Sequence, residues 1–160
     1  MTRWRRTWSR FLARVRARDG EAGNAVLEFL GASLVLLVPI VYLVLVLGRV
    51  QAATFAAEGA AREAARTYVT ADSSAVGTRQ AVSSVRIALR DQAFDDDPAQ
   101  ALTLSCSTTP CLVPGGRVEA HVEIRVPLPF VPAFVRGAVP LEVPVSAERV
   151  AAVDEFRSAR

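Results

Sequence analysis

One uninterrupted apolar run dominates the pattern of hydrophobic and polar positions in this chain. Residues 29–47, FLGASLVLLVPIVYLVLVL, carry no charge, and fourteen of these nineteen residues are Leu, Val, Ile or Phe. A helix of this length rises roughly 28 Å, close to the hydrocarbon thickness of a bilayer. Such side chains favour insertion by roughly 4 to 8 kcal/mol before small and polar positions are counted. The run therefore predicts a transmembrane helix, with a kink or local unwinding at Pro39.

The helical pattern continues beyond the apolar run. Residues 50–69, VQAATFAAEGAAREAARTYV, are rich in alanine, the best helix former, and place Glu58 and Arg62 four residues apart. We therefore expect one helix over residues 24–69, spanning the membrane and projecting beyond it. Small side chains on one face would allow close packing against a sheet or a neighbouring subunit; they are Ala52, Ala56, Gly59, Ala60 and Ala64.

Further along, a second helix is expected over residues 74–94, ended by the sequence DDDP at residues 95–98. After residue 100 the period changes from helical to alternating, in ALTLSC, GRVEAHVEIRV and LEVPVSAERV. The apolar positions form one face of these strands; they are Val118, Ala120, Val122, Ile124, Val126, Leu141, Val143, Val145 and Ala147. The predicted class is α+β: a long transmembrane helix that continues outside the membrane, a second helix, and a small three-stranded antiparallel sheet resting on the outer helices.

Charge is distributed unevenly and sets the expected topology. The chain has a net charge of +3. Seven arginines precede the apolar run, whereas residues 49–160 hold twelve arginines and thirteen acidic residues. The positive-inside bias then predicts a single-pass cell-membrane protein with a cytoplasmic N-terminus and an extracytoplasmic domain. A nucleic-acid partner is not expected, because its binding needs a basic face on the folded domain. The predicted organisation is a basic leader over 1–23, the helix over 24–69, and an α+β head over 70–160.

The only two cysteines, Cys106 and Cys111, bracket the short sequence CSTTPC. On the oxidising side of a membrane they are expected to form a disulfide, the alternative being two free thiols in a loop. A disulfide would matter for stability, because the predicted core is small. Redox or metal chemistry is not favoured, since the spacing is not CxxC.

A catalytic constellation is not found in the sequence. His121 is the single histidine, and alternation places it on the polar face of a strand. The run Asp95 to Asp97 lacks the one-residue spacing and downstream glutamate of a calcium loop, so a solvated helix end is favoured. We therefore expect neither an enzyme nor a bound cofactor or metal.

A carboxylate at the edge of the apolar run needs an explanation. Glu28 precedes the run in the sequence GNAVLEF, residues 23–29. One interpretation is a helix-terminal acid that interacts with the helix dipole and reaches water at the headgroup level. The other comes from spacing: a basic leader, Gly23, a glutamate five residues later and an apolar helix resemble the processing site of type IV prepilins. That resemblance implies cleavage after Gly23 by a prepilin peptidase, leaving Asn24 as the amino terminus.

More narrowly, the sequence is similar to the TadE-like family, the minor pseudopilins of the Tad (tight adherence) pilus and secretion machinery. The features that carry this resemblance are Glu28 followed by Phe29, the short chain, and AAREAAR at residues 60–66. It implies that Glu28 and Phe29 serve in the register and assembly of subunits. It also implies that the partners are the peptidase, other pilin or pseudopilin subunits, the pilus assembly platform and the bilayer. The main alternative is an uncleaved, membrane-anchored extracytoplasmic binding protein. A secreted protein with a signal peptide and an extracytoplasmic enzyme are less favoured.

Overall fold

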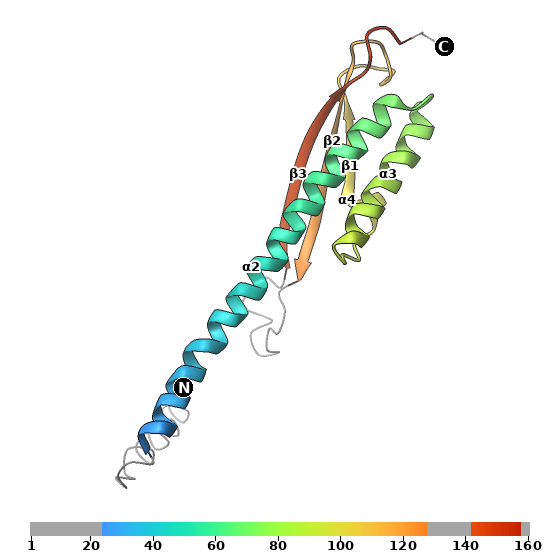
Figure 1. Cartoon of the computed structure of the whole chain (residues 1–160). Helices are drawn as coiled ribbons and strands as arrows, with labels where there is room; N and C mark the ends of the chain where they lie inside the picture. Colours follow the sequence, from blue (N-terminus) through green and yellow to red (C-terminus); the bar gives the residue numbers. More distant parts are fainter. Residues whose placement is uncertain (1–23, 128–141, 158–160) are drawn as a thin grey trace, which may run out of the picture. The chain divides into compact units, whose positions relative to one another are not determined.

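The computed structural model describes residues 24–127 and 142–157. The chain divides into two compact units, Met1–Val44 and Leu45–Arg160, and the second is called the head here. Helix α2 (Asn24–Thr70) contributes to both units. Its first half, within the first unit, is the coil at the blue end of Figure 1. Leu141, which was expected on the apolar face of a strand, lies outside the described residues.

The described part of the head contains the second half of α2, α3 (Ser74–Asp91), the short α4 (Pro98–Ala101), and strands β1 (Leu102–Cys106), β2 (Arg117–Pro127) and β3 (Glu142–Ala152). The strands form an antiparallel sheet in the order β1-β2-β3. In Figure 1 α2 and α3 run side by side along this sheet. The expected α+β class, with a long helix, a second helix and a three-stranded antiparallel sheet, is confirmed.

The core lies between the helices and one face of the sheet. Alternate β2 residues from Val118 to Val126 are almost fully buried, whereas Glu123 and Arg125 on the opposite face are exposed. Seven alanines of α2 have 3% or less of their surface exposed and meet this apolar face; they are Ala53, Ala56, Ala57, Ala60, Ala61, Ala64 and Ala65. Alanine lets the helix backbone approach the sheet closely, and the longer side chains of Val85 and Leu89 on α3 complete the core.

Helix α3 differs from the expectation at its end. It is capped at its start by Ser73, whose hydroxyl accepts from the Val76 amide, and it ends at Asp91 rather than near Phe94. Ala93 then takes a left-handed conformation, with φ 53°, which turns the chain and buries Phe94. The turn separates α3 from the acidic run, and the predicted helix over 74–94 is therefore three residues too long.

Helix α4 was not predicted, although its local signal is present. Asp97 caps it by accepting a hydrogen bond from the Ala99 amide at 2.8 Å, and Pro98 occupies the first turn. An acidic cap followed by proline is a common way to begin a helix. The single turn leads directly into β1, so the acidic run serves as a connection between α3 and the sheet.

The expected pair of Glu58 with Arg62 is not formed. Glu58 instead lies 3.6 Å from Arg149, which projects from β3 toward the helices. The helical spacing allowed a local pair, but the antiparallel return of β3 offers a second cation. The other described pair on this helix joins Arg66 to Glu63, one turn earlier.

Candidate assembly site

The residues expected to direct assembly lie at the start of α2. Gly23 falls outside the described residues, Asn24 begins the helix as described, and Glu28 follows one turn later. Glu28 is exposed, and so is Phe29, with 69% of its surface accessible. Both side chains are therefore available to a lipid or to a neighbouring subunit.

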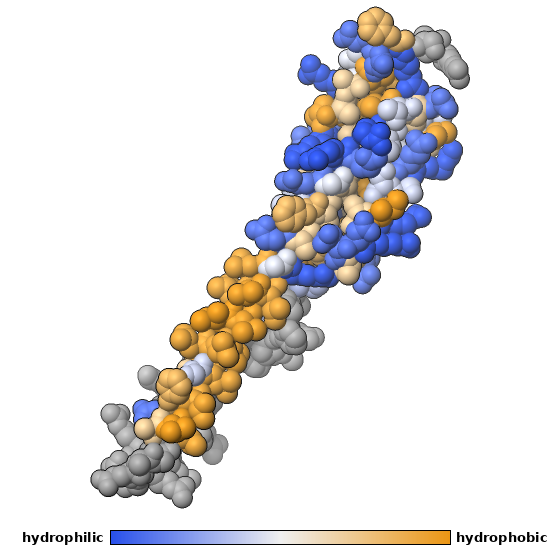
Figure 2. Space-filling view, viewed as in Figure 1, coloured by the Kyte–Doolittle hydropathy of each residue, from blue (hydrophilic) through white to orange (hydrophobic). Residues whose placement is uncertain are grey.

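Glu28 is the only charged residue of α2 before Arg49. The large apolar side chains between them are mostly exposed; Val35, for example, has 76% of its surface accessible. Figure 2 shows this apolar surface as the orange part of the helix. One helix in the described part of the chain is long and apolar enough to cross a membrane, and its most apolar window is 0% buried. These properties are compatible with a single-pass membrane anchor.

Small residues in this apolar segment lie on an open surface. A Cβ added at Gly31 or at Gly48 would have no atom within 4 Å. In the head, by contrast, Ala56, Ala60 and Ala64 are buried against the sheet of the same chain. The face of small residues expected to pack against either a sheet or another subunit thus packs mainly against the sheet of its own chain. Of the five small residues expected on this face, only Gly59 is exposed.

Arg49, the first charged residue after the apolar run, joins α2 to the end of α3. Its guanidinium donates to the carbonyl oxygens of Gln92 at 3.1 Å and Ala93 at 2.6 Å. The guanidinium carbon lies 4.4 Å from the centre of the Phe94 ring. A cation at a helix C-terminus is favourable because the carbonyl groups there lack helical partners. The sequence alone does not reveal this contact, since it depends on how α3 folds back along α2.

The two cysteines form the expected disulfide, with an S–S distance of 2.22 Å. It closes the start of the β1–β2 connection, and both cysteines are half-buried. They pack against a small cluster that includes Tyr68, Val118 and Val153. The disulfide therefore ties the connection to the second, smaller part of the core.

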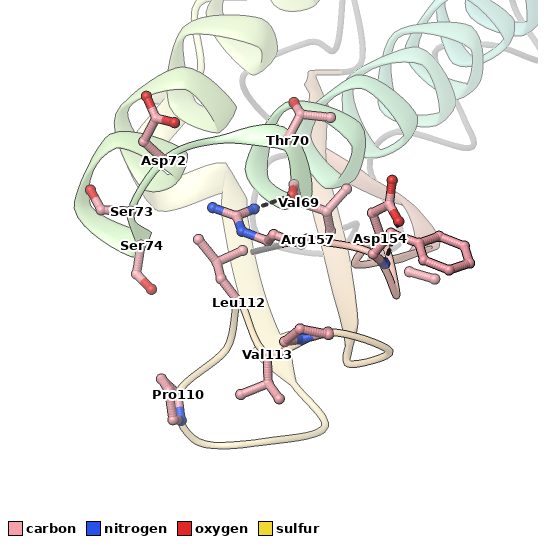
Figure 3. A pocket seen from close by; sticks show the side chains of 13 residues that line it. Val69, Thr70, Asp72, Ser73, Ser74, Pro110, Leu112, Val113, Asp154 and Arg157 are labelled. Carbon is pink, nitrogen blue, oxygen red and sulfur yellow. Dashed lines mark hydrogen bonds between the residues drawn. The ribbon is translucent and has the colours of Figure 1, made fainter. Parts of the chain in front are cut away.

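A hollow of about 1010 Å³ lies beside this connection, where α2 turns into α3. Figure 3 shows Arg157, from the C-terminal segment, lining this hollow. Its guanidinium donates a hydrogen bond to the Val69 carbonyl at 2.9 Å. The guanidinium also donates to the carbonyl of Ala71. Arg157 therefore caps the C-terminus of α2, and its donors are directed at the backbone rather than into the hollow.

His121 lies on the outer face of β2 as expected, half-buried between Thr103 of β1 and Glu148 of β3. Among the residues that the structure describes, no group of three or more His, Cys, Asp or Glu is arranged to hold a metal ion. The carboxylate of Asp96 accepts a hydrogen bond from the Arg125 amide at 3.1 Å, which fixes the acidic run to the edge of β2.

Glu63 and Arg66, an ion pair on the outer surface of α2, shift each other's pKa. A hydrogen bond from Arg66 lowers the pKa of the Glu63 carboxyl, and the same bond raises the pKa of Arg66. Both groups are exposed, so solvent screening leaves the pair little weight in stability.

The chain was also compared with known proteins. No protein-family model, no curated protein and no solved structure matches it.

Proposed function

We propose that this chain is a TadE-like minor pseudopilin, a structural and assembly component of a Tad-type pilus or a related secretion system. The observation that carries the proposal is an exposed carboxylate, Glu28, that is the only charge on α2 until Arg49. It stands five residues after Gly23, at the end of an arginine-rich leader. In this reading a prepilin peptidase removes residues 1–23 on the cytoplasmic side, and the head lies outside the membrane.

Cleavage after Gly23 would create a positively charged amino group on Asn24. That group and the Glu28 carboxylate lie about one helical turn, roughly 6 Å, apart along the axis. In neighbouring helices packed side by side, the carboxylate of one copy would neutralise the amine of the next. An unpaired charge at this depth costs energy, because lipid solvates it poorly. The pair would therefore fix the axial register between subunits in the membrane.

Two substitutions in the full chain, expressed in its native host, test processing and register separately. Gly23→Ala should block removal of the leader, whereas the control Gly20→Ala, three residues upstream, should not. Glu28→Gln should leave processing intact but reduce incorporation of the protein into assembled fibres or complexes; Glu58→Gln in the head is its matched control.

The outcomes separate the family from the mechanism. Cleavage of Gly23→Ala at the wild-type rate would contradict the processing site. Normal assembly of Glu28→Gln would contradict the register role, even if the leader is removed as proposed.

A further inference from the structure

Two opposite faces of the head carry side chains of opposite charge. The outward side of α3 presents Arg79, Arg86 and Arg90 around the exposed side chain of Ile87, and these four residues are called the arginine face. Helical spacing places them on one side, opposite the buried Val85 and Leu89. Ile87 has 59% of its surface accessible.

The outer face of the sheet carries more acidic than basic side chains, since Glu119, Glu123, Glu142 and Glu148 outnumber Arg117 and Arg125. Glu119 of β2 lies opposite Val150 of β3 in the antiparallel register, and Glu148 is two residues before Val150 on the same face. These three residues are called the glutamate face. Val150 has 57% of its surface accessible, and no described helix covers this side of the sheet. Neither Glu119 nor Glu148 forms an ion pair within the described part of the chain.

The spacing of the charges matches. Arg86 and Arg90 are one helical turn apart, so their Cβ atoms are separated by about 5–6 Å. Glu119 and Glu148 are diagonal neighbours across two strands, at about 7–8 Å. Long arginine side chains can span that small difference. Each face also has one exposed aliphatic side chain beside its charges, which provides an apolar contact at the centre of a polar rim.

We infer that the arginine face of one copy docks on the glutamate face of a second copy of this chain. This inference rests on the proposed membrane anchoring, which holds all copies in parallel. The two faces point in opposite directions from the head, so a parallel neighbour brings unlike faces together. Two arginine faces would repel each other, which disfavours a closed two-fold dimer. A contact between unlike faces leaves one of each free, and it therefore propagates into a row of subunits.

The balance of charges supports the direction of docking. Of the two arginines on the outer face of β2, Arg125 lies 3.8 Å from Glu123, whereas Arg117 stands two residues before Glu119 and forms no ion pair among the described residues. Glu119 and Glu148 together still exceed the single positive charge of Arg117. On α3, Asp91 follows Arg90 at the end of the helix, but the other two arginines have no acidic neighbour on that helix. Rim charges of this kind give specificity more than affinity. Anchoring in a membrane compensates for the weak affinity, because it raises the effective concentration of neighbouring heads.

Cysteine cross-linking in membranes tests the contact with the full chain and its native disulfide intact. Ile87→Cys and Val150→Cys are expressed separately, together as two chains, and as a double variant. We expect an oxidised dimer only from the co-expressed chains and a ladder of higher species from the double variant. Ala99→Cys, at an exposed position of α4, replaces either partner as the control and should give no dimer.

Charge reversal tests the chemistry of the contact. Arg86→Glu with Arg90→Glu should abolish the ladder, and adding Glu119→Arg with Glu148→Arg should restore it. An ionic strength near 1 M should also weaken the ladder, since the screening length falls to about 3 Å.

Three results would overturn the inference: no dimer from the co-expressed chains, an equal dimer from Ile87→Cys alone, or a ladder insensitive to charge reversal. The amino terminus of the same samples is sequenced in parallel. Absence of cross-links with a terminus at Asn24 would reject only the contact between heads, whereas an intact leader would reject the proposed function.

Discussion

Replacing Arg49 with alanine should loosen the turn after α3 without unfolding the head. The side chain makes two hydrogen bonds to carbonyl oxygens, those of Gln92 and Ala93, and covers the ring of Phe94. A hydrogen bond to a charged group contributes about 1.5–3 kcal/mol when it is shielded from water. Arg49 is only half-buried, so we expect about 0.5–1 kcal/mol from each bond, with about 0.5–1 kcal/mol from the ring contact. The sum is about 2 kcal/mol.

Amide hydrogen exchange of the full chain in detergent micelles measures this local effect. The amides of Gln92 and Ala93 bond to the carbonyl oxygens of Leu89 and Arg90 at 3.2 and 3.0 Å, and the Phe94 amide bonds to that of Leu89 at 2.9 Å. A loss of about 2 kcal/mol should speed their exchange roughly 30-fold, at about 1.4 kcal/mol for each tenfold change. The central amides of β2 should be unaffected and serve as the internal reference.

The matched control is Arg62→Ala, which removes an exposed arginine from the same helix. Its exchange profile at residues 92–94 should equal that of the wild type. Full protection of these amides in Arg49→Ala would refute the role assigned to Arg49. Equal acceleration in the two arginine variants would also refute it, because the effect would then come from the loss of any charge on α2.

Five further substitutions test the packing, the glycines and the disulfide of the head through denaturant or thermal unfolding of the full chain. Leu89→Ala removes a side chain that is only 1% exposed and should lower the free energy of unfolding by about 2–5 kcal/mol. Ile87→Ala, on the exposed side of α3, should lower it by less than about 1 kcal/mol. Equal losses of stability would refute the assignment of buried and exposed faces to α3. Gly59→Ala should stabilise α2 by about 0.5–1 kcal/mol, because the added Cβ meets open space. Gly77→Ala should destabilise the head, since the added Cβ would lie 3.0 Å from the ring of Tyr68. Cys106→Ser should cost about 2 kcal/mol through the lost closure of a loop with a sequence separation of 5, and an unchanged midpoint would contradict this role for the disulfide.

The elements that the sequence predicted well are those with a strong period. Alternation from Val118 to Val126 requires a strand with one buried face, and the structure has that strand and that face. The long helix was equally clear, because an apolar run followed by alanine permits little else. The proline in that run, Pro39, does not divide α2.

The contacts that the sequence did not reveal depend on elements meeting in space. The Glu58–Arg149 pair is set by the register of β3, and the Arg49 contact by the antiparallel return of α3. No local rule includes those partners. Helix α4 is different, since Asp97 and Pro98 are a local signal for a helix start that the sequence itself contains.

For the candidate assembly site, the structure adds little to the sequence. The spacing between Gly23 and Glu28 is a sequence property, and the structure adds that Glu28 and Phe29 are exposed on α2. The disulfide between Cys106 and Cys111 was likewise predicted from compartment and spacing. The glutamate face could not be predicted, because the proximity of Glu119 to Glu148 and Val150 depends on the register between β2 and β3.

The most direct measurement is the amino-terminal sequence of the mature protein isolated from membranes of its native host. The account predicts that the chain begins at Asn24, with residues 1–23 removed. A protein that functions with Met1 and the arginine-rich leader still in place would contradict the proposed processing and the charge pair built on it. That result would favour the uncleaved, membrane-anchored binding protein instead.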